Sequence, residues 1–255
     1  MYKNLKSPYI RVANDTIPDH SMFAYKYFKS HLLSFAQRDL QLPLIKRVLR
    51  DSLRGIAALH DKGIVHTDIK ANNIVLDWDD SDGKITIQEV QVADIEDAAH
   101  VPDGYAIVGT QVGNWMWRSP EAHASGQVHT PSDMFSFGIV CIHAVTKRVI
   151  FAVADEELVE GEDKLAVVIE RQLSYFSDPE SLSGLLHHLD DSPWTQIFTI
   201  IASGFNHKRP RAPFALWNGL EPEFKDLIGK MTNIDPKKRI TAIVALSHPW
   251  FADVV

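Results

Sequence analysis

The sequence predicts a mainly α-helical fold of the α+β class, in which a few short β-hairpins accompany a helical bundle. Two segments predict the helices: residues 44–60 carry one continuous apolar stripe, and residues 134–145 are apolar nearly all round. Two short apolar runs, residues 74–76 and 85–87, predict strands. With 255 residues and 45% apolar content the chain can bury a substantial core, and we expect a single domain over residues 1–255.

The first elements in chain order are a strand and a long helix. Residues 21–28 predict a short strand, and a polar stretch follows it. From residue 44 to residue 60 apolar side chains recur every three or four positions, which places them on one helix face. They are Ile45, Val48, Leu49, Leu53, Ile56 and Leu59. Gly63 is expected to mark the end of this helix, because glycine readily adopts the left-handed conformation that follows a last turn.

An acidic turn, residues 77–83, joins the two predicted strands. Its carboxylates raise the alternative of a calcium site. The turn lacks the twelve-residue spacing and the terminal glutamate of a calcium-binding helix-loop-helix, so a solvated hairpin tip is the favoured interpretation.

The second half of the chain predicts further helices around a buried central one. Thr130 is expected to cap the central helix, with Pro131 at its first position, and apolar residues on every side indicate burial. These residues are Met134, Phe135, Phe137, Ile139, Val140, Ile142, Ala144 and Val145. A later helix carries an apolar stripe, and a final one is capped by Thr241. Their apolar residues are Phe224, Leu227, Ile228 and Met231 in the first, and Ile243, Ala245 and Leu246 in the second.

Composition argues against several classes of function. The chain has 26 Lys and Arg against 33 Asp and Glu, and this net charge of −7 argues against binding nucleic acid or an anionic membrane. The basic cluster Lys237-Lys238-Arg239 is too short to change this and is interpreted as solvated surface. The single cysteine, Cys141, lies in an apolar run, which predicts a core thiol and a reducing compartment. Without a signal-peptide-like stretch or a run of 18 apolar residues, we expect a cytoplasmic or nuclear location.

Residues 66–73, His-Thr-Asp-Ile-Lys-Ala-Asn-Asn, carry the pattern H-x-D-x-K-x-x-N. Phosphoryl transfer needs a carboxylate that accepts the proton of the substrate hydroxyl, a cation near the moving phosphate and an oxygen ligand for Mg²⁺. Asp68, Lys70 and Asn73 would fill these roles in that order. A polar turn between two short strands is the structural alternative for the same residues.

Further motifs stand in the order found in the large lobe of protein kinases, and residues 22–251 resemble that lobe. The residues that carry the resemblance are the loop at 66–73, Asp94-Ile95-Glu96, Trp117-Arg118-Ser119-Pro120-Glu121, Asp133-Met134-Phe135-Ser136-Phe137-Gly138, and Asp235-Pro236 through Arg239 to His248-Pro249-Trp250-Phe251. They are similar, in turn, to the catalytic loop, the D-F-G metal triplet, the A-P-E block, the buried D-x-x-S-x-G helix and the C-terminal signature of the family. The resemblance implies a protein-kinase-like C-lobe over residues 29–255, with residues 1–28 as a remnant of the small lobe and hinge.

The resemblance also implies a reaction and its cofactors. The implied reaction transfers the γ-phosphate of ATP to Ser or Thr hydroxyls of proteins, since a lysine two residues after the base is typical of serine/threonine kinases. ATP and Mg²⁺ are the implied cofactors, with Asp68 and Lys70 catalytic and with Asn73 and Asp94 as metal ligands. The implied nucleotide-binding residues are Lys70, Asn73 and Asp94, with Tyr25 and Tyr27 in a hinge-like segment whose backbone would meet adenine.

Scaffold roles follow from the same resemblance. Glu121 is expected to form a buried ion pair with Arg239, and Asp133 is expected to accept hydrogen bonds from the catalytic-loop backbone. His66 is expected to be a packed, hydrogen-bonded loop residue, because the family assigns proton acceptance to the aspartate.

The most evident departure from the family pattern concerns the small lobe. Residues 1–21 precede the hinge-like segment, and the sequence contains no G-x-G-x-x-G loop and no V-A-I-K lysine. The glycines at positions 104, 109 and 113 indicate a mobile activation segment instead. Losing one preorganised contact costs roughly 3 kcal/mol of transition-state stabilisation. We therefore expect weak or absent activity from this chain alone, unless a partner supplies a small lobe.

Two substitutions within the motifs bear on control. Thr67 stands where most family members have an arginine that grips a phosphorylated activation segment, so we expect phosphorylation of Thr110 not to activate the protein by that route. Thr67 also makes the loop similar to that of SR-protein kinases. Glu96 replaces the glycine of the metal triplet, which removes backbone freedom and adds a carboxylate near a metal ligand.

Two functional hypotheses remain open, and both imply a protein partner as substrate or regulator. The first is a serine/threonine protein kinase, and the alternative is a catalytically dead pseudokinase that acts as a protein-binding regulatory module. Residues 155–157 and 160–163 are interpreted as a solvated acidic loop, and residues 171–217 as a region that could hold a partner site. His187-His188 lacks the surrounding pattern of a zinc site.

Overall fold

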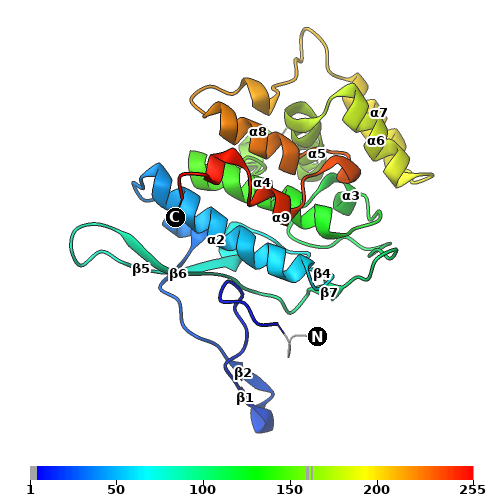
Figure 1. Ribbon diagram of the computed structural model, residues 1–255. Helices are drawn as coiled ribbons and strands as arrows, with labels where there is room; N and C mark the ends of the chain where they lie inside the picture. The colour runs from blue at the N-terminus through cyan, green and yellow to red at the C-terminus, as the bar shows by residue number, and fades with distance from the viewer. Residues whose placement is uncertain (1–4, 159–160, 162, 255) are drawn as a thin grey trace.

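The computed structural model describes residues 5–158, 161 and 163–254. Residues 1–4, at the start of the predicted small-lobe remnant, and Glu160 and Glu162 of the predicted acidic loop lie outside the described residues. The helices are α1 (Leu32–Phe35), α2 (Leu42–His60), α3 (Pro120–His123), α4 (Thr130–Thr146), α5 (Lys164–Phe176), α6 (Pro179–Leu189), α7 (Trp194–Ser203), α8 (Pro222–Met231) and α9 (Ala242–Ala245). The strands are β1 (Asp15–Ile17), β2 (Met22–Ala24), β3 (Ser30–His31), β4 (Ile64–Val65), β5 (Ile74–Asp79), β6 (Thr86–Val92) and β7 (Ala99–His100). The helices form one body, from which the β1–β2 hairpin projects (Figure 1), in agreement with the mainly helical class that the sequence predicts.

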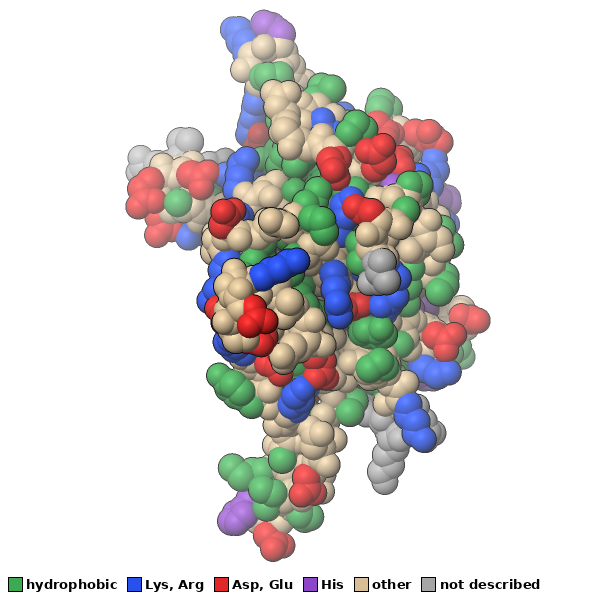
Figure 2. Space-filling view, turned by 60° about the vertical axis from the view of Figure 1, so that its left-hand side comes forward, with side chains coloured by type: hydrophobic (Ala, Val, Ile, Leu, Met, Phe, Trp, Pro, Cys, Tyr) green, Lys and Arg blue, Asp and Glu red, His purple; other side chains and the backbone are tan. Residues whose placement is uncertain are grey.

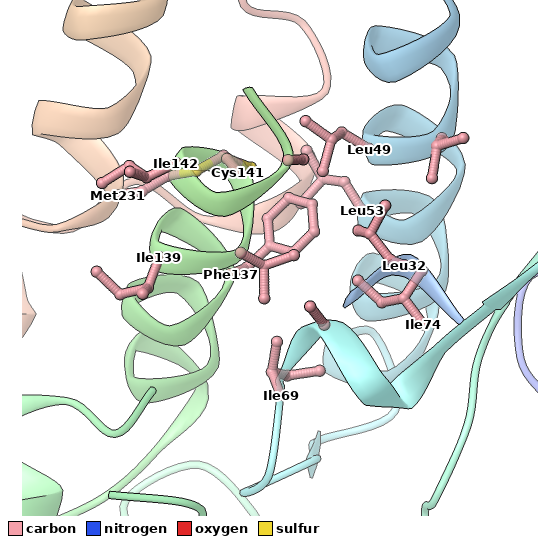
Figure 3. Close-up of a cluster of buried hydrophobic side chains, with 14 of the residues drawn as sticks. Leu32, Leu49, Leu53, Ile69, Ile74, Phe137, Ile139, Cys141, Ile142 and Met231 are labelled. Carbon is pink, nitrogen blue, oxygen red and sulfur yellow. The ribbon is translucent and has the colours of Figure 1, made fainter. Parts of the chain in front are cut away.

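Helices α2 and α4 form the centre of this body. All six apolar positions predicted for α2 are buried, and α4 buries most of its residues on every side. The ring of Phe137 on α4 points toward Leu49 and Leu53 on α2, and Ile69 of the catalytic loop packs into the same cluster (Figure 3). Burying each such side chain contributes about 1.5–3 kcal/mol, so the core that fixes the helices also fixes the loop. The thiol of Cys141 is buried in this core, as predicted.

The two predicted helix caps have different outcomes. Helix α4 begins at Thr130 itself and its N-cap is His129, so the predicted Thr130 cap is wrong and Pro131 takes the second helical position. The extended backbone that a cap requires lies one residue earlier than predicted, at His129. Thr241 does cap α9, because its hydroxyl accepts a backbone N–H of the first turn at 3.4 Å. None of the described helices is long and apolar enough to cross a membrane.

The strands form three small antiparallel sheets, in the orders β1–β2, β3–β5–β6 and β4–β7. The strand predicted over residues 21–28 is confirmed only for Met22–Ala24, which form β2, and β3 begins after the predicted segment, at Ser30. The β5–β6 hairpin is longer than predicted, so the turn between its strands is shorter. Residues 80–84 at its tip are exposed, which confirms the solvated hairpin tip.

A short segment before β1 ties the N-terminal part of the chain to the helical body. The backbone N–H of Val92 donates to Tyr9 O, and that of Arg11 donates to Val92 O, both at 2.8 Å. Gly55 of α2 allows this approach, since a Cβ atom there would lie 2.5 Å from Tyr9 O. The segment therefore lies against both β6 and α2, and the chain leaves the body only beyond it.

The projecting β1–β2 hairpin exposes apolar side chains. Ile17 is 44% exposed, Met22 58% and Phe23 62%. Figure 2 shows hydrophobic side chains on the projection at the bottom of the view. Within the described residues β1 and β2 pair only with each other, so the outer edges of both strands are free.

Candidate active site

The catalytic loop between β4 and β5 is held by a buried carboxylate. Asp133, 1% exposed on α4, accepts hydrogen bonds from the backbone N–H of His66 at 2.8 Å and of Thr67 at 2.9 Å. Nε2 of His60, at the end of α2, lies 2.9 Å from the same carboxylate. The ring of His66 is fully buried, with its Nε2 atom 2.9 Å from the carbonyl oxygen of Ala93. These contacts confirm the scaffold roles predicted for Asp133 and His66.

The structure brings Asp68, Lys70 and Asn73 together. The ammonium group of Lys70 forms an ion pair with Oδ2 of Asp68. Asn73 Nδ2 donates to the backbone carbonyl of Asp68 at 2.9 Å and to its Oδ2 atom at 3.3 Å. From a distant part of the chain, the backbone N–H of Asn114 donates to Asp68 Oδ1 at 2.9 Å. Both carboxylate oxygens of Asp68 are therefore engaged, and its orientation is fixed before any substrate arrives.

A cavity of about 510 Å³ opens at this carboxylate. Thr67, Asp68 and Lys70 contribute to its lining, and so do residues 111–114. The side chain of Asp68 is 16% exposed, so it is accessible from the cavity. This volume lies within the usual range for ligand pockets. A hydroxyl-bearing side chain entering the cavity would meet a carboxylate already oriented to accept its proton.

Asp94 and Asn73 are the residues predicted to hold a divalent cation, and both carry an oxygen atom of the type that a hard cation prefers. Desolvation raises the pKa of Asp94, the nearby Glu96 carboxylate raises it further, and Lys70 partly opposes both effects. Negative charge is therefore incompletely balanced at Asp94, and a cation would relieve it. Among the described residues Asn73 Oδ1 accepts no hydrogen bond, because the amide NH₂ is the group turned toward Asp68.

One carboxylate and one amide oxygen suit Mg²⁺, which often takes only one or two protein ligands and fills its other positions with phosphate oxygens and water. No group of three or more His, Cys, Asp or Glu side chains within the described residues is placed to hold a metal ion. A metal at Asp94 and Asn73 would therefore depend on nucleotide phosphates for further ligands.

The hinge-like segment reaches the metal triplet through one tyrosine. Tyr25 donates a hydrogen bond from its hydroxyl group to Glu96 Oε1 at 2.6 Å, and the guanidinium of Arg11 lies 4.8 Å from the centre of the tyrosine ring. The hydrogen bond raises the pKa of Tyr25 and lowers that of Glu96. Tyr27 is 81% exposed and makes no corresponding side-chain contact among the described residues. Of the two predicted tyrosines, only Tyr25 has its side chain at the metal triplet, and the adenine contact stays a prediction.

The segment predicted to be the activation segment lies close against the catalytic loop at Gly113. A Cβ atom at this position would lie 2.4 Å from Thr67 O, and Gly113 has a φ of +78°, so only glycine fits. Thr67 itself has a φ of +70°, a costly conformation for a β-branched residue. Its hydroxyl donates to Asp97 O at 3.2 Å. Thr67, which stands where most members of the resembled family have an arginine, therefore makes a local backbone contact here.

The buried ion pair between Glu121 and Arg239 is present as predicted. Two contacts of 2.5 and 2.7 Å join the guanidinium to the carboxylate, and the side chains are 0% and 1% exposed. Arg239 also donates to three backbone carbonyl groups. The interpretation of the basic cluster as solvated surface holds for Lys237 and Lys238, but it is wrong for Arg239. Electrostatic pairing with Glu121 accounts for its burial.

Three residues that were not predicted as site residues, Asn114, Arg118 and Gln111, also shape the site. Asn114 contacts Asp68 through its backbone N–H, so its side-chain type gives no signal. Arg118 donates to Gln111 Oε1 at 2.9 Å and to the carbonyl oxygen of Gly113. The sequence signal that could have identified this contact is the positive charge of Arg118 directly after Trp117.

Comparisons with known proteins are consistent with this geometry. A family model described as a protein kinase domain matches residues 1–251. The chain is 26% identical over 208 residues to the serine/threonine-protein kinase ste20 of Emericella nidulans, which covers 82% of this chain and 18% of that protein. It is 27% identical over 216 residues to the mitogen-activated protein kinase HOG1 of Kluyveromyces lactis, which covers 84% of this chain and 43% of that protein. The chain thus spans about a fifth of the length of the first relative and somewhat less than half of the second.

A solved structure shows the same fold. A chain of the yeast RNA Pol II CTD kinase CTDK-1 complex matches 99% of this chain and 79% of its own length, with a TM-score of 0.77 and 18% sequence identity. At that identity the likeness concerns the fold alone. The family assignment rests on the match to the protein kinase domain over nearly the whole sequence, and the chain belongs to the protein kinase family.

Proposed function

We propose that this chain is the catalytic lobe of a serine/threonine protein kinase, which transfers the γ-phosphate of ATP to Ser or Thr hydroxyls of proteins. The observation that carries the proposal is the convergence of three groups on Asp68: the Lys70 ammonium, the Asn73 amide and the Asn114 backbone N–H. This arrangement supports a preorganised base beside an open cavity. A polar turn between strands, the structural alternative, would require no such convergence from two distant parts of the chain.

In the proposed reaction Asp68 accepts the proton of the acceptor hydroxyl. The hydroxyl oxygen forms a bond to the γ-phosphorus, the bond from that phosphorus to the bridging oxygen breaks, and ADP leaves. Lys70 supplies positive charge next to the transferring group, while Asn73 and Asp94 would hold the metal. Mg²⁺, when bound, neutralises charge on the phosphates.

Selectivity for Ser and Thr is proposed from Lys70 and from the relatives. The two relatives described above carry serine/threonine-protein kinase or mitogen-activated protein kinase in their names. A serine-bearing peptide is therefore the preferred test substrate, with the matching tyrosine peptide as its control.

The test measures transfer of labelled phosphate from Mg·ATP to a basic peptide that contains one serine. We expect slow incorporation by the wild-type chain, and a fall of about 10²–10⁴-fold in Asp68→Asn, because loss of a general base typically costs that factor. Equal incorporation by both proteins would exclude catalysis by this site. The variant Asp82→Asn, at the exposed hairpin tip, is the matched control and should behave as wild type.

A binding module without catalysis is the second candidate, and one contact favours it. Glu96 accepts a hydrogen bond from Tyr25, two residues from the proposed metal ligand Asp94, so binding of ATP there would have to accommodate an existing interaction. The melting temperature separates the two candidates, since a ligand that binds only the native state raises it. A rise with Mg·ATP that is reduced in Asp94→Asn supports the kinase, and no rise at millimolar nucleotide supports the binding module.

A protein partner that completes the nucleotide-covering lobe belongs to the same proposal. The free edges of β1 and β2 and the exposed side chains of Met22 and Phe23 suit the addition of strands from another polypeptide. Such a partner would exclude water from the site and supply the phosphate contacts that the sequence lacks. With it, we expect the transfer rate to rise without any change at Asp68.

A further inference from the structure

Residues 111–114 line one side of the cavity at Asp68, and we call them the acceptor wall. The wall touches the catalytic loop at two points. Gly113 lies against the carbonyl of Thr67, where a Cβ atom would be only 2.4 Å away, and the backbone N–H of Asn114 donates to Asp68 Oδ1. A shift of the wall would therefore remove a hydrogen bond from the proposed base and change the shape of the cavity.

Arg118 donates hydrogen bonds to three residues of the acceptor wall. Its Nη1 atom donates to Gln111 Oε1 at 2.9 Å, and its Nη2 atom donates to the carbonyl oxygen of Gly113 at 2.5 Å. Its backbone N–H donates to Asn114 O at 2.9 Å. One residue thus contacts the first, third and fourth members of the wall.

Arg118 is itself anchored in the helical body. Its carbonyl oxygen accepts a hydrogen bond from Gln172 Nε2 on α5 at 2.8 Å. Gln111, at the other end of the contact, donates from its own amide to His123 O at 2.8 Å. The wall is consequently linked to α5 on one side and to α3 on the other.

Burial lowers the pKa of Arg118, and only the nearby Asp68 carboxylate, which is not at ion-pair distance, partly opposes this effect. Within the described residues no carboxylate lies at ion-pair distance from Arg118, its two terminal nitrogens bind neutral oxygens, and its buried Nε atom has no hydrogen-bond partner. A half-buried cation with such partners costs stability. The arrangement therefore does little for the stability of the fold, but it positions the acceptor wall, because a planar guanidinium fixes two acceptors in one geometry.

The usual means of ordering an activation segment is absent from this chain. Thr67 takes the place of the arginine that would bind a phosphate on the segment, and Thr67 is occupied with Asp97 O. Thr110, the residue before the wall, is exposed. The contacts from Arg118 to the wall do not involve Thr110.

We propose that Arg118 is a positioning residue that holds the acceptor wall against Asp68 without phosphorylation of the activation segment. The effect on rate depends on the proposed kinase function, whereas the effect on backbone order does not. Two readouts, amide hydrogen exchange and kinetics, therefore distinguish failure of the positioning role of Arg118 from failure of the proposed kinase function.

Hydrogen exchange of the Asn114 amide in the full chain is the first readout. In Arg118→Gln we expect this amide to exchange roughly tenfold faster or more, while amides of α4 keep their rates, because exchange follows local opening. Arg118→Lys keeps the positive charge but loses the planar guanidinium that binds two acceptors. Its exchange rate at Asn114 should lie between those of the wild type and Arg118→Gln. Arg209→Gln, which removes an exposed arginine paired with Glu170, is the matched control and should change nothing at Asn114.

Gln111→Leu keeps the test decisive if Arg118→Gln does not fold. Gln111 is exposed, so its loss cannot remove core packing, and we expect roughly threefold faster exchange at Asn114 from the loss of one acceptor. Thr110→Ala should leave exchange unchanged. Unchanged exchange in the Arg118 or Gln111 variant overturns the proposal, and so does a wild-type amide that becomes protected only after Thr110 is phosphorylated.

The second readout is steady-state kinetics. We expect Arg118→Gln to raise KM for the serine peptide roughly tenfold and to leave KM for Mg·ATP unchanged, since the wall lies on the acceptor side. A general loss of structure would instead change both values. If no variant shows activity but exchange at Asn114 responds as expected, the proposed function fails and the positioning role of Arg118 stands.

Discussion

His123 shows how a single buried residue makes the stability of this fold depend on pH. The ring is fully buried on α3, and within the described residues neither ring nitrogen makes a hydrogen bond of normal geometry, although the backbone of Trp115 lies close enough to oppose slightly the lowering of the His123 pKa. Burial, and to a smaller extent the charge of Arg118, lower the pKa of His123 from 6.5 to about 3. The folded chain therefore keeps this ring neutral between pH 6.5 and 3, while the unfolded chain binds a proton there. The stability associated with a neutral His123 is complete above pH 6.5 and is lost as the pH falls toward 3.

Replacing His123 with leucine should remove this part of the acid sensitivity. At pH 5.5 the wild type should have lost about 1.4 kcal/mol from this residue relative to pH 7.5, and the variant should not show that loss. Urea unfolding at the two pH values measures the difference. His207→Leu, at an exposed position, is the control, and equal acid sensitivity in His123→Leu and wild type would contradict the expectation.

For single residues, the sequence predicts the contacts made by side chains far better than the contacts made by backbone groups. The spacing of Asp68, Lys70 and Asn73 was enough to bring them together, because all three lie in one short loop whose ends are fixed by strands. The contact from Asn114 was not predictable in this way. It uses a backbone N–H group, which every residue except proline carries, so no pattern of residue types marks it.

At the scale of elements, two glycines with the same helical backbone should respond in opposite ways to alanine. Gly138 lies in the buried helix α4, where a Cβ atom would be 2.6 Å from a methyl group of Thr232 and 3.2 Å from Met231 Cβ. Gly229 lies on the exposed face of α8, where nothing comes within 4 Å. Overpacking typically costs about 1–3 kcal/mol, whereas alanine gains up to about 1 kcal/mol over glycine inside a helix.

We therefore expect Gly138→Ala to lower the free energy of unfolding by about 1–2 kcal/mol and Gly229→Ala to raise it by about 0.5–1 kcal/mol. Each variant serves as the control for the other, because the chemical change is identical. Urea denaturation at neutral pH measures both values. A stabilised Gly138→Ala would show that α4 and α8 are packed less closely than the distances indicate.

Long helices were predictable from their apolar period, whereas shorter elements depended on contacts that the sequence does not reveal. The stripe of α2 and the uniformly apolar α4 both identify helices at the centre of the core. Helices α5 and α6 carry detectable signals in their caps, since the side chains of Asp163 and Asp178 each accept a backbone N–H of the first turn. The strand over residues 21–28 could not be placed correctly, because a two-stranded hairpin gains little from local sequence and its ends are set by pairing elsewhere.

For the whole molecule, the helical body and the β1–β2 hairpin differ in how firmly they are held. The body has a continuous core that includes the catalytic loop, and the buried ion pair of Glu121 and Arg239 joins its distant parts. The hairpin lies outside that core, with free strand edges and exposed apolar side chains. The proposed catalytic groups are thus rigidly placed, while the surface expected to cover them is the part most open to other proteins.

This hairpin should make the isolated chain self-associate, because an apolar two-stranded sheet with free edges can pair with another copy. We expect the sedimentation coefficient of the wild type to rise with concentration, and the double variant Met22→Lys/Phe23→Lys to remain monomeric over the same range. The melting temperature should be the same for both proteins, since these side chains are 58% and 62% exposed and contribute little to the core. Ile200→Lys on α7 is the matched control, because it removes a side chain that is 60% exposed but lies on no sheet edge. Association that persists in the double variant but disappears in Ile200→Lys would place the self-association surface on α7. It would also remove the main support for a partner that adds strands to β1 and β2.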